Sequence, residues 1–313
     1  MRISLHQACE FLKKGHVVGI PTETVYGLAA CLDQSQAIAE IFTLKGRPAN
    51  NPLIVHLATA EEIKDYAVSI PESFFALADA FWPGPLTLVL PAIPEKIPSI
   101  VRAELPTAAF RVPSHSLARQ LLQQTGPLVM PSANLSGRPS STCAEHVEED
   151  FGDGFPVLDG GECLKGLEST ILFWQDEKWM IIRLGAIAPE AFGLILGYDP
   201  EISLGEGNAQ PICPGQMYRH YAPRARLFLI QKFSLAIKGL VIGFDDRNYS
   251  SASRFISLGN SSDPETASQR LYAILRELDQ EGIDQAWVDI DLPDEGLWLT
   301  FKERLFKASS SLT

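Results

Sequence analysis

Cysteines, basic residues and long apolar runs are all scarce in this sequence, and each shortage argues against a class of protein. The five cysteines among 313 residues are widely spaced and include no C-x-x-C pair, which argues against both a disulfide framework and a structural zinc site. No run of about 18 apolar residues is present to span a membrane. The N-terminal segment MRISLHQACEFLKKGH lacks the apolar stretch of a signal peptide. The simplest location is therefore the cytoplasm, away from any membrane.

Acidic residues outnumber basic residues by 38 to 26, which gives a formal net charge of −12. Non-specific affinity for nucleic acid comes from neutralising phosphates with lysine and arginine, so we expect no tight nucleic-acid binding. Any anionic ligand must be held by a local cluster of bases. Hydrophobic residues make up 46% and charged residues 20% of the chain, which is a globular composition. The length suffices for one large domain or two ordinary ones.

Short apolar runs alternate with amphipathic segments over residues 1–200, a pattern that predicts an α/β sheet with helices packed on it. Asp33 is placed to cap the helix that follows it, and Gly46-x-Pro48 to end that helix. The candidate strands are residues 17–21, 53–57, 86–90, 108–112, 128–130, 170–173 and 179–183. The candidate helices are residues 5–14, 34–45, 73–82, 117–124, 144–151 and 189–196.

The pattern lapses over residues 201–223, where glycine and proline are frequent and periodic apolar runs are missing. This stretch is predicted to be a linker. A second, smaller α/β domain is predicted over residues 224–313, with strands at 227–230, 240–244 and 286–290 and a helix at 264–281. It shows no cluster of catalytic residue types, so only support and gating can be assigned to it.

The linker ends in MYRHYAPRAR, which concentrates groups that bind anions and stack on rings. Packing of the linker onto a domain surface explains these residues equally well. Familiar nucleotide-binding motifs are absent: there is no G-x-x-x-x-G-K-[ST] loop, and Gly205-Glu206-Gly207 stops short of a dinucleotide fingerprint. A G-x-S-x-G elbow is missing as well. A nucleotide, if bound, must be held by another device.

Polar clusters stand instead at the ends of several predicted strands, where open α/β sheets bind their ligands. TETVYGL at residues 22–28 follows one strand and SANLSG at 132–137 follows another. Glycine beside small polar side chains lets the backbone approach a phosphate or purine. A turn capped by threonine hydroxyls is the equally weighted alternative for the first cluster.

Four bases accompany these clusters and predict one positively lined cavity. Lys45 and Arg47 can reach the same side of their loop, and an arginine fork beside a lysine suits a polyphosphate. The preference of helix C-termini for cations accounts for Lys45 alone. Arg111 lies within an apolar strand, where its charge needs a partner, either a protein carboxylate or a ligand anion. Arg183 ends the last predicted strand of the first domain.

Taken together, these blocks resemble the YrdC-like family of threonylcarbamoyl-AMP synthases. Lys45-x-Arg47 with Ser132-x-Asn134 is similar to the pairing that marks the family. PTETVYGL, KGRPANNPLIVH, FWPGPLTLVL, PTAAFRVP, PSANLSG and GLESTI look like its blocks in the same order. PGQMYRHYAP resembles the junction of the family's long, two-domain form, and the likeness covers nearly the whole chain.

The resemblance implies a twisted mixed sheet with a deep cavity, followed by a smaller Rossmann-like α/β domain. It implies that threonine and bicarbonate or CO₂ form a carbamate, whose oxygen attacks the α-phosphorus of ATP to give threonylcarbamoyl-AMP and pyrophosphate. The expected enzyme is thus a nucleotidyltransferase of tRNA processing, and a separate tRNA threonylcarbamoyltransferase uses its product. Mg²⁺ is expected with ATP, because metal ions bridge and neutralise phosphates.

The resemblance also carries residue roles onto this chain. Lys45 and Arg47 are expected to be catalytic, and loss of either base to cost on the order of 10²–10³ in rate. His220 and Tyr221 of the linker are expected to close over the nucleotide. The expected ATP contacts are Lys45, Arg47, Asn51, Thr107, Ser132, Asn134, Arg183, His220 and Tyr221. The expected threonine contacts are Thr24, Tyr26, His56, Arg111 and Ser169, with Arg111 pairing the substrate carboxylate.

Two other functions remain open on the sequence alone. YrdC-like domains resemble RNA-binding modules in having a basic concavity, although the net charge of −12 weighs against tight tRNA binding. A YrdC-like domain also occurs in carbamoyl transfer for hydrogenase maturation. Those proteins carry zinc-binding cysteine pairs, which this chain lacks.

Overall fold

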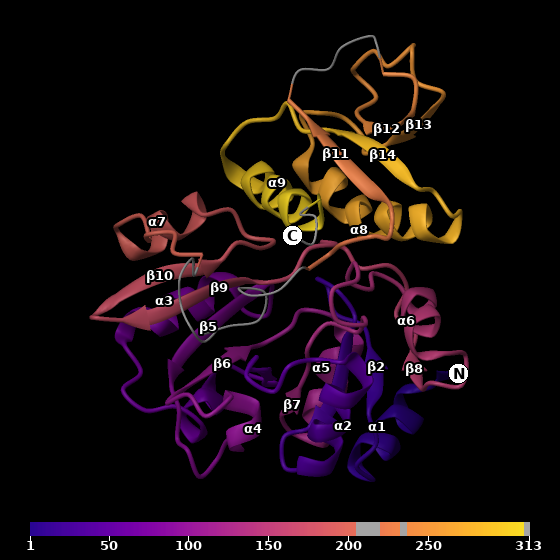
Figure 1. Ribbon diagram of the computed structural model, residues 1–313. Coiled ribbons are helices and arrows are strands. Elements are labelled where there is room, and N and C mark those ends of the chain that lie inside the picture. The colour runs from indigo at the N-terminus through magenta and orange to yellow at the C-terminus, as the bar shows by residue number, and fades with distance from the viewer. Residues whose placement is uncertain (205–219, 232–236, 310–313) are drawn as a thin grey trace.

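A twisted, mixed sheet of ten strands forms the larger part of the molecule (Figure 1). The computed structural model describes residues 1–204, 220–231 and 237–309. The strand order is β1-β8-β2-β3-β7-β4-β6-β5-β9-β10. The strands are β1 (Arg2–Ile3), β2 (Val18–Ile20), β3 (Gly27–Cys31), β4 (Ile54–His56), β5 (Leu86–Pro91), β6 (Thr107–Arg111), β7 (Leu128–Val129), β8 (Val157–Leu158), β9 (Thr170–Gln175) and β10 (Lys178–Arg183).

Helices bury both faces of this sheet, and β3 shows how. Successive side chains of a strand point to opposite faces. Leu28 and Ala30 pack into a core cluster with Ile41 of α2, whereas Ala29 and Cys31 pack into another with α1 and α5. The helices of this domain are α1 (Leu5–Lys13), α2 (Ser35–Lys45), the 3₁₀ helix η1 (Glu61–Asp65), α3 (Glu72–Phe81), α4 (Ser99–Arg102), α5 (Ser116–Thr125), α6 (Ala144–Phe151) and α7 (Glu190–Leu196).

A second sheet has four parallel strands in the order β11-β14-β12-β13. Its strands are β11 (Arg226–Ile230), β12 (Leu240–Gly243), β13 (Arg254–Ser257) and β14 (Gln285–Asp289), and its helices are α8 (Pro264–Gln280) and α9 (Gly296–Ser309). In Figure 1, α8 and α9 lie between this sheet and the larger domain. Parallel strands with helices on one side make this the small Rossmann-like domain that was expected.

The predicted α/β class with a second, smaller α/β domain is confirmed, and every strand and helix predicted within residues 1–200 is present within two residues of its predicted bounds. Asp33 was wrongly expected to cap α2, because the helix begins one residue later, at a Gln34 N-cap without a side-chain hydrogen bond. Gly46 does end α2, in the left-handed conformation that favours glycine. The domain boundaries at 200 and 223 stay predictions, and residues 205–219 of the predicted linker lie outside the described residues.

The two domains are joined by buried polar contacts. The Arg276 side chain of α8 is fully buried and donates to an Asp150 carboxylate oxygen at 3.0 Å, to the Pro139 carbonyl at 2.7 Å and to the Ser141 hydroxyl at 3.1 Å. Thr300 of α9 donates to the Gly185 carbonyl at 3.0 Å. A buried charge without its partner is costly, so these contacts fix how the smaller domain docks.

We expect Arg276→Gln to lower the free energy of unfolding by about 3–5 kcal/mol, because the buried Asp150 carboxylate loses a charged partner. Arg254→Gln is the matched control, since Arg254 forms ion pairs at the surface of the same domain and should change stability little. Denaturant unfolding followed by tryptophan fluorescence measures both. Equal stability of the two variants would contradict the assigned role of Arg276.

Candidate active site

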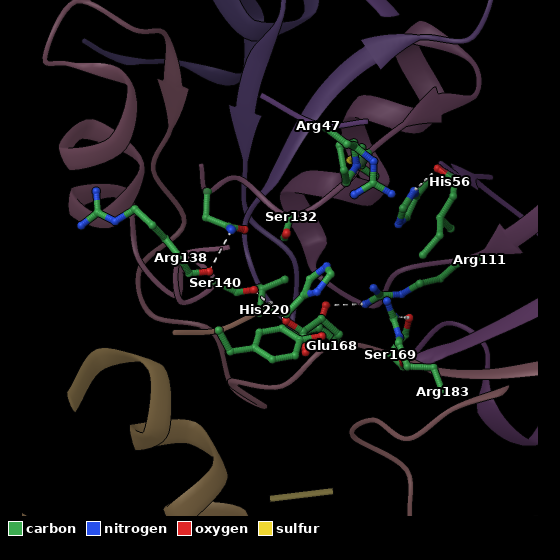
Figure 2. Close-up of a pocket in the computed structure, with 17 residues that line it drawn as sticks. Arg47, His56, Arg111, Ser132, Arg138, Ser140, Glu168, Ser169, Arg183 and His220 are labelled. Carbon is green, nitrogen blue, oxygen red and sulfur yellow. Dashed lines mark hydrogen bonds between the residues drawn. The ribbon is translucent and has the colours of Figure 1, made fainter. Parts of the chain in front are cut away.

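A polar cavity opens beside the ends of several strands of the large sheet (Figure 2). Because β4 and β6 are parallel, with His56 aligned to Arg111, both side chains reach the same end of the sheet. The start of β9 and the end of β10 lie at this end too, because β9 runs parallel to β5, which is antiparallel to β6. The lining residues are Thr24, Val25, Arg47, Ile54, His56, Arg111, Met130, Pro131, Ser132, Asn134, Arg138, Ser140, Glu168, Ser169, Arg183, His220 and Tyr221.

Arg111 is buried and pairs with a protein carboxylate, which settles the alternative left open by the sequence. Its Nη2 donates to Glu23 Oε1 at 2.6 Å and to Thr24 Oγ1 at 2.9 Å, and its Nε donates to the Gly84 carbonyl at 3.2 Å. The Ser114 amide donates to the other Glu23 oxygen at 3.0 Å. Burial alone would raise the pKa of Glu23, but the Arg111 charge and hydrogen bond outweigh it and leave the pKa below its ordinary value.

Arg47 is held at the cavity by its own loop. Its Nη2 donates to Asn51 Oδ1 at 2.7 Å and to the Pro52 carbonyl at 2.8 Å, while its Nε donates to the Asn51 carbonyl at 3.2 Å. The left-handed Gly46 lets the chain leave α2 directly into this loop. Asn51 therefore orients Arg47, although it was expected to contact the ligand itself and does not line the cavity.

Lys45 lies behind the loop of residues 132–134 and outside the cavity lining, in contrast to the expected phosphate contact. Its Nζ donates to the carbonyls of Ser132 at 2.6 Å and Asn134 at 2.5 Å. Complete burial, with the nearby Arg47 charge adding to it, holds the pKa of Lys45 well below its ordinary value. Lys45 thus fixes the loop that presents Ser132 and Asn134.

The Asn134 side chain is itself buried and half satisfied. Its Nδ2 donates to the Leu135 and Arg138 carbonyls at 2.8 and 3.0 Å. Its Oδ1 is a buried acceptor without a hydrogen-bond donor among the described residues. Since Asn134 lines the cavity, this oxygen is available to a donor on a ligand.

Arg183 and Ser169 form the opposite side of the cavity. Arg183 donates from Nη2 to the Ser169 carbonyl at 2.8 Å and to its hydroxyl at 3.0 Å. That hydroxyl also lies 2.7 Å from the Thr87 hydroxyl. His56 is buried nearby, and burial together with the Arg111 charge lowers its pKa well below the ordinary value, so the imidazole is neutral at pH 7.

Two residues expected at the ligand lie elsewhere. Thr107 begins β6, four residues before Arg111, and pairs with Pro91 at the far end of the strand. Thr107 does not line the described cavity, and its expected contact with ATP stays a prediction. Tyr26 is buried behind the cavity, where its hydroxyl donates to the Gly161 carbonyl at 2.8 Å and accepts from the Gly160 amide at 2.9 Å.

Three polar lining residues were not among the expected ligand contacts: Arg138, Ser140 and Glu168. Glu168 precedes the predicted Ser169 in the GLESTI block, and Arg138 follows the SANLSG cluster, so position in these motifs was the available signal. Arg138 points away from the centre of the site in Figure 2 and pairs with Asp150 at 2.5 Å. The other predicted residues, Thr24, Arg47, His56, Arg111, Ser132, Asn134, Ser169, Arg183, His220 and Tyr221, are brought together at the cavity.

The fold and this cavity define a two-domain α/β protein with a polar cavity at the strand ends of its larger sheet. A family model described as "Telomere recombination" (Sua5, YciO and YrdC) matches residues 10–185, and one described as "Threonylcarbamoyl-AMP synthase, C-terminal domain" matches residues 187–310. The chain belongs to the threonylcarbamoyl-AMP synthase family, in its two-domain form. The resemblance seen in its sequence blocks is thereby confirmed.

Similar proteins support this membership over the full length. Threonylcarbamoyl-AMP synthase of Bacillus subtilis is 38% identical over 97% of this chain and 92% of its own length. The crystal structure of P. abyssi Sua5 complexed with L-threonine matches with a TM-score of 0.90 and 35% identity, covering 99% of this chain and 96% of that one. E. coli YciO, at 23% identity and a TM-score of 0.53 over 59% of this chain and 93% of its own, shows the fold of the first domain alone.

Within the described ranges, no helix is long and apolar enough to cross a membrane. The same residues contain no group of three or more histidine, cysteine or acidic side chains placed to hold a metal ion.

We expect Glu23→Gln to destabilise the protein by about 3–5 kcal/mol near neutral pH, because it leaves Arg111 buried beside a neutral partner. The lowered pKa of Glu23 makes its contribution present above about pH 4.5 and lost as the pH falls through the folded-state value. The stability gap between wild type and variant should therefore shrink below about pH 4.5. Unfolding midpoints across pH measure it, with the exposed Glu10→Gln as control. A gap that is constant down to acid pH would contradict the pairing.

Proposed function

We propose that this protein joins L-threonine, bicarbonate or CO₂, and ATP into threonylcarbamoyl-AMP and pyrophosphate, and so acts as a nucleotidyltransferase. The observation that carries the proposal is a cavity lined by Arg47, Arg111 and Arg183 in a chain of net charge −12. Such a concentration of guanidinium groups suits a ligand with several negative charges. Membership of the synthase family, and the L-threonine bound in the P. abyssi relative, name the ligands.

We place the phosphates of ATP at Arg47. The contacts with Asn51 and Pro52 hold the guanidinium in place among the residues that line the cavity. The buried Asn134 Oδ1 is the natural acceptor for an exocyclic amine or a ribose hydroxyl of the nucleotide. His220 and Tyr221 of the linker lie on the same cavity and would cover the bound nucleotide from the side of the second domain.

We place threonine beside Arg111 and His56. A guanidinium offers five N–H donors, and the three Arg111 contacts described above leave room for a substrate carboxylate next to Glu23. His56 lies 3.2 Å from the Ile54 carbonyl through Nδ1, so a proton there leaves Nε2 of the neutral ring as an acceptor for the substrate hydroxyl or amine. Thr24 and Ser169 add hydroxyl groups on either side.

The reaction balances in two steps. The threonine amine adds to the carbon of CO₂ and loses a proton to give a carbamate. With bicarbonate, that proton leaves together with a hydroxyl of bicarbonate as one water molecule. A carbamate oxygen then forms a bond to the α-phosphorus as the bond to the pyrophosphate oxygen breaks. Two anions must meet in this second step, so the arginines lower the barrier by neutralising charge and by holding the reactants in line.

We propose that Mg²⁺ enters with ATP and is held mainly by phosphate oxygens, which matches the lack of a protein metal cluster among the described residues. When bound it would neutralise phosphate charge. The product would serve a separate tRNA threonylcarbamoyltransferase in the cytoplasm.

The first test is pyrophosphate release from the full chain with ATP, Mg²⁺ and bicarbonate, with and without threonine, followed by mass spectrometry of the products. We expect threonine-dependent release and a threonylcarbamoyl-adenylate mass. Arg47→Ala should cost on the order of 10²–10³ in kcat/KM. Lys45→Ala should cost a similar factor through loss of the 132–134 loop geometry.

Arg254→Ala is the control, because Arg254 forms ion pairs at the surface of the second domain and its loss should leave the rate unchanged. Full activity of Arg47→Ala would refute its role at the phosphates. If none of threonine, serine and carbamoyl phosphate supports turnover, the proposed reaction is wrong. Salt-dependent RNA binding is then the next function to measure.

A further inference from the structure

Two polar side chains of the second domain meet at Glu168, a residue of the cavity lining. Glu168 lines the cavity, and its carboxylate is buried. One oxygen, Oε2, accepts from the Tyr272 hydroxyl of α8 and from Arg304 Nε of α9, each at 3.0 Å. The other, Oε1, accepts from the Ser140 hydroxyl at 2.6 Å. A residue of the first domain is thus held from the second.

Arg304 also holds the linker against the cavity. Its guanidinium lies 4.9 Å from the ring centroid of Tyr221, within cation–π range. The Tyr221 ring in turn stacks on Tyr272, with centroids 5.4 Å apart and planes 22° from parallel. Arg304 Nη2 donates to the Leu184 carbonyl at 2.6 Å, and Nη1 pairs with the neighbouring Glu303. Glu303 also forms an ion pair with Lys307, whose Nζ lies 2.5 Å from Glu303 Oε1, so Arg304 is not its sole partner.

Glu168 is the acidic group among the described lining residues of a cavity assigned to ATP. Burial alone would raise its pKa, but the Arg304 and Arg183 charges and the Ser140 hydrogen bond outweigh burial and keep the pKa below its ordinary value. The carboxylate is therefore ionised at pH 7. An ionised carboxylate in a weakly solvated wall repels phosphates over several ångströms unless a cation compensates it.

We propose that Arg304 is a positioning residue for the nucleotide: from the second domain it compensates the charge of Glu168 and holds Glu168 and Tyr221 at the cavity. This inference rests on the proposed ATP-dependent function. It assigns the second domain a direct part in nucleotide affinity, beyond support and gating. The groups that face Glu168 are Ser140, Arg183, Tyr221, Tyr272 and Arg304.

Charge compensation of Glu168 and simple packing by Arg304 predict different ATP affinities for the double variant. If Arg304 acts by neutralising Glu168, Arg304→Gln should raise the KM for ATP on the order of tenfold, with a smaller change in kcat. Glu168→Gln in the same chain removes the uncompensated negative charge, so the double variant should recover most of the loss. If Arg304 only packs, the second substitution removes a further contact and worsens the defect.

The pH dependence of the KM for ATP also distinguishes charge compensation from simple packing. In Arg304→Gln the burial of Glu168 is no longer opposed by its main counter-charge, so the pKa of Glu168 rises. Protonation then removes the repulsion, so the KM for ATP of this variant should fall toward that of the double variant as the pH is lowered through the raised pKa of Glu168. The double variant has no carboxyl at this position and should lack that dependence.

The experiment measures steady-state pyrophosphate release and calorimetric ATP binding by the full chain. It compares wild type, Glu168→Gln, Arg304→Gln, Arg304→Lys, the double variant and Arg270→Gln, an exposed arginine of α8 that should behave as wild type. Arg304→Lys should keep part of the affinity, because it retains the charge without the guanidinium fork. If Arg304→Gln alone fails to fold, the paired Gln substitutions keep the test open, since removing both charges of a buried pair is far less costly than removing one.

An unchanged ATP affinity in Arg304→Gln, or a double variant no better than Arg304→Gln, overturns the inference. These outcomes differ from failure of the proposed function. A wild type that binds ATP but gives no threonine-dependent turnover refutes the synthase reaction, while the binding data still decide the role of Arg304. A wild type that does not bind ATP overturns both.

Discussion

A guanidinium group inside a protein needs partners within hydrogen-bond distance, because its transfer out of water costs several kcal/mol. The present fold buries four such groups around or beside one cavity and meets that need differently for each. Arg111 forms an ion pair with Glu23 of the loop after β2. Arg276 pairs with Asp150 across the domain interface, and Arg304 pairs with Glu168. Arg183 donates hydrogen bonds to the Ser169 carbonyl and hydroxyl. Loop positions, strand ends and domain docking all follow from these pairings.

The pairings also divide the positive charge of the site. A carboxylate partner cancels most of the charge that it satisfies, whereas a carbonyl or hydroxyl orients the guanidinium and leaves the charge in place. Arg47 and Arg183 donate to neutral oxygens in the contacts described above, and both line the cavity, where their side chains can meet an anion. The Arg183 charge also acts on Glu168. Arg111, already paired with Glu23, is suited to orientation of a ligand carboxylate. An overall acidic chain can in this way carry a local anion site.

Much of this was predictable because the first domain obeys simple rules. Apolar runs bounded by glycine and proline predict strands such as β4 and β5, and polar residues just beyond them mark the site. β3 was missed because its sequence, GLAAC, is poor in the β-branched and aromatic residues that strands favour. Thr107 and Arg111 belong to one motif but lie at opposite ends of β6, because an extended strand separates its residues by about 3.3 Å each.

The part contributed by the second domain could not be predicted from local pattern. Helix α9 carries Trp298, Phe301 and Leu305 at helical spacing, a pattern that indicates a helix, although this helix was not predicted. The pairing of Arg304 with Glu168 could not be predicted, because an arginine on a helix usually faces solvent. In addition, 136 residues separate the two partners in sequence. Only docking of the second domain brings that charge to the cavity wall. Contacts of this kind make the site a property of the assembled chain, so its electrostatics depend on domain docking as much as on the strand ends that the motifs reveal.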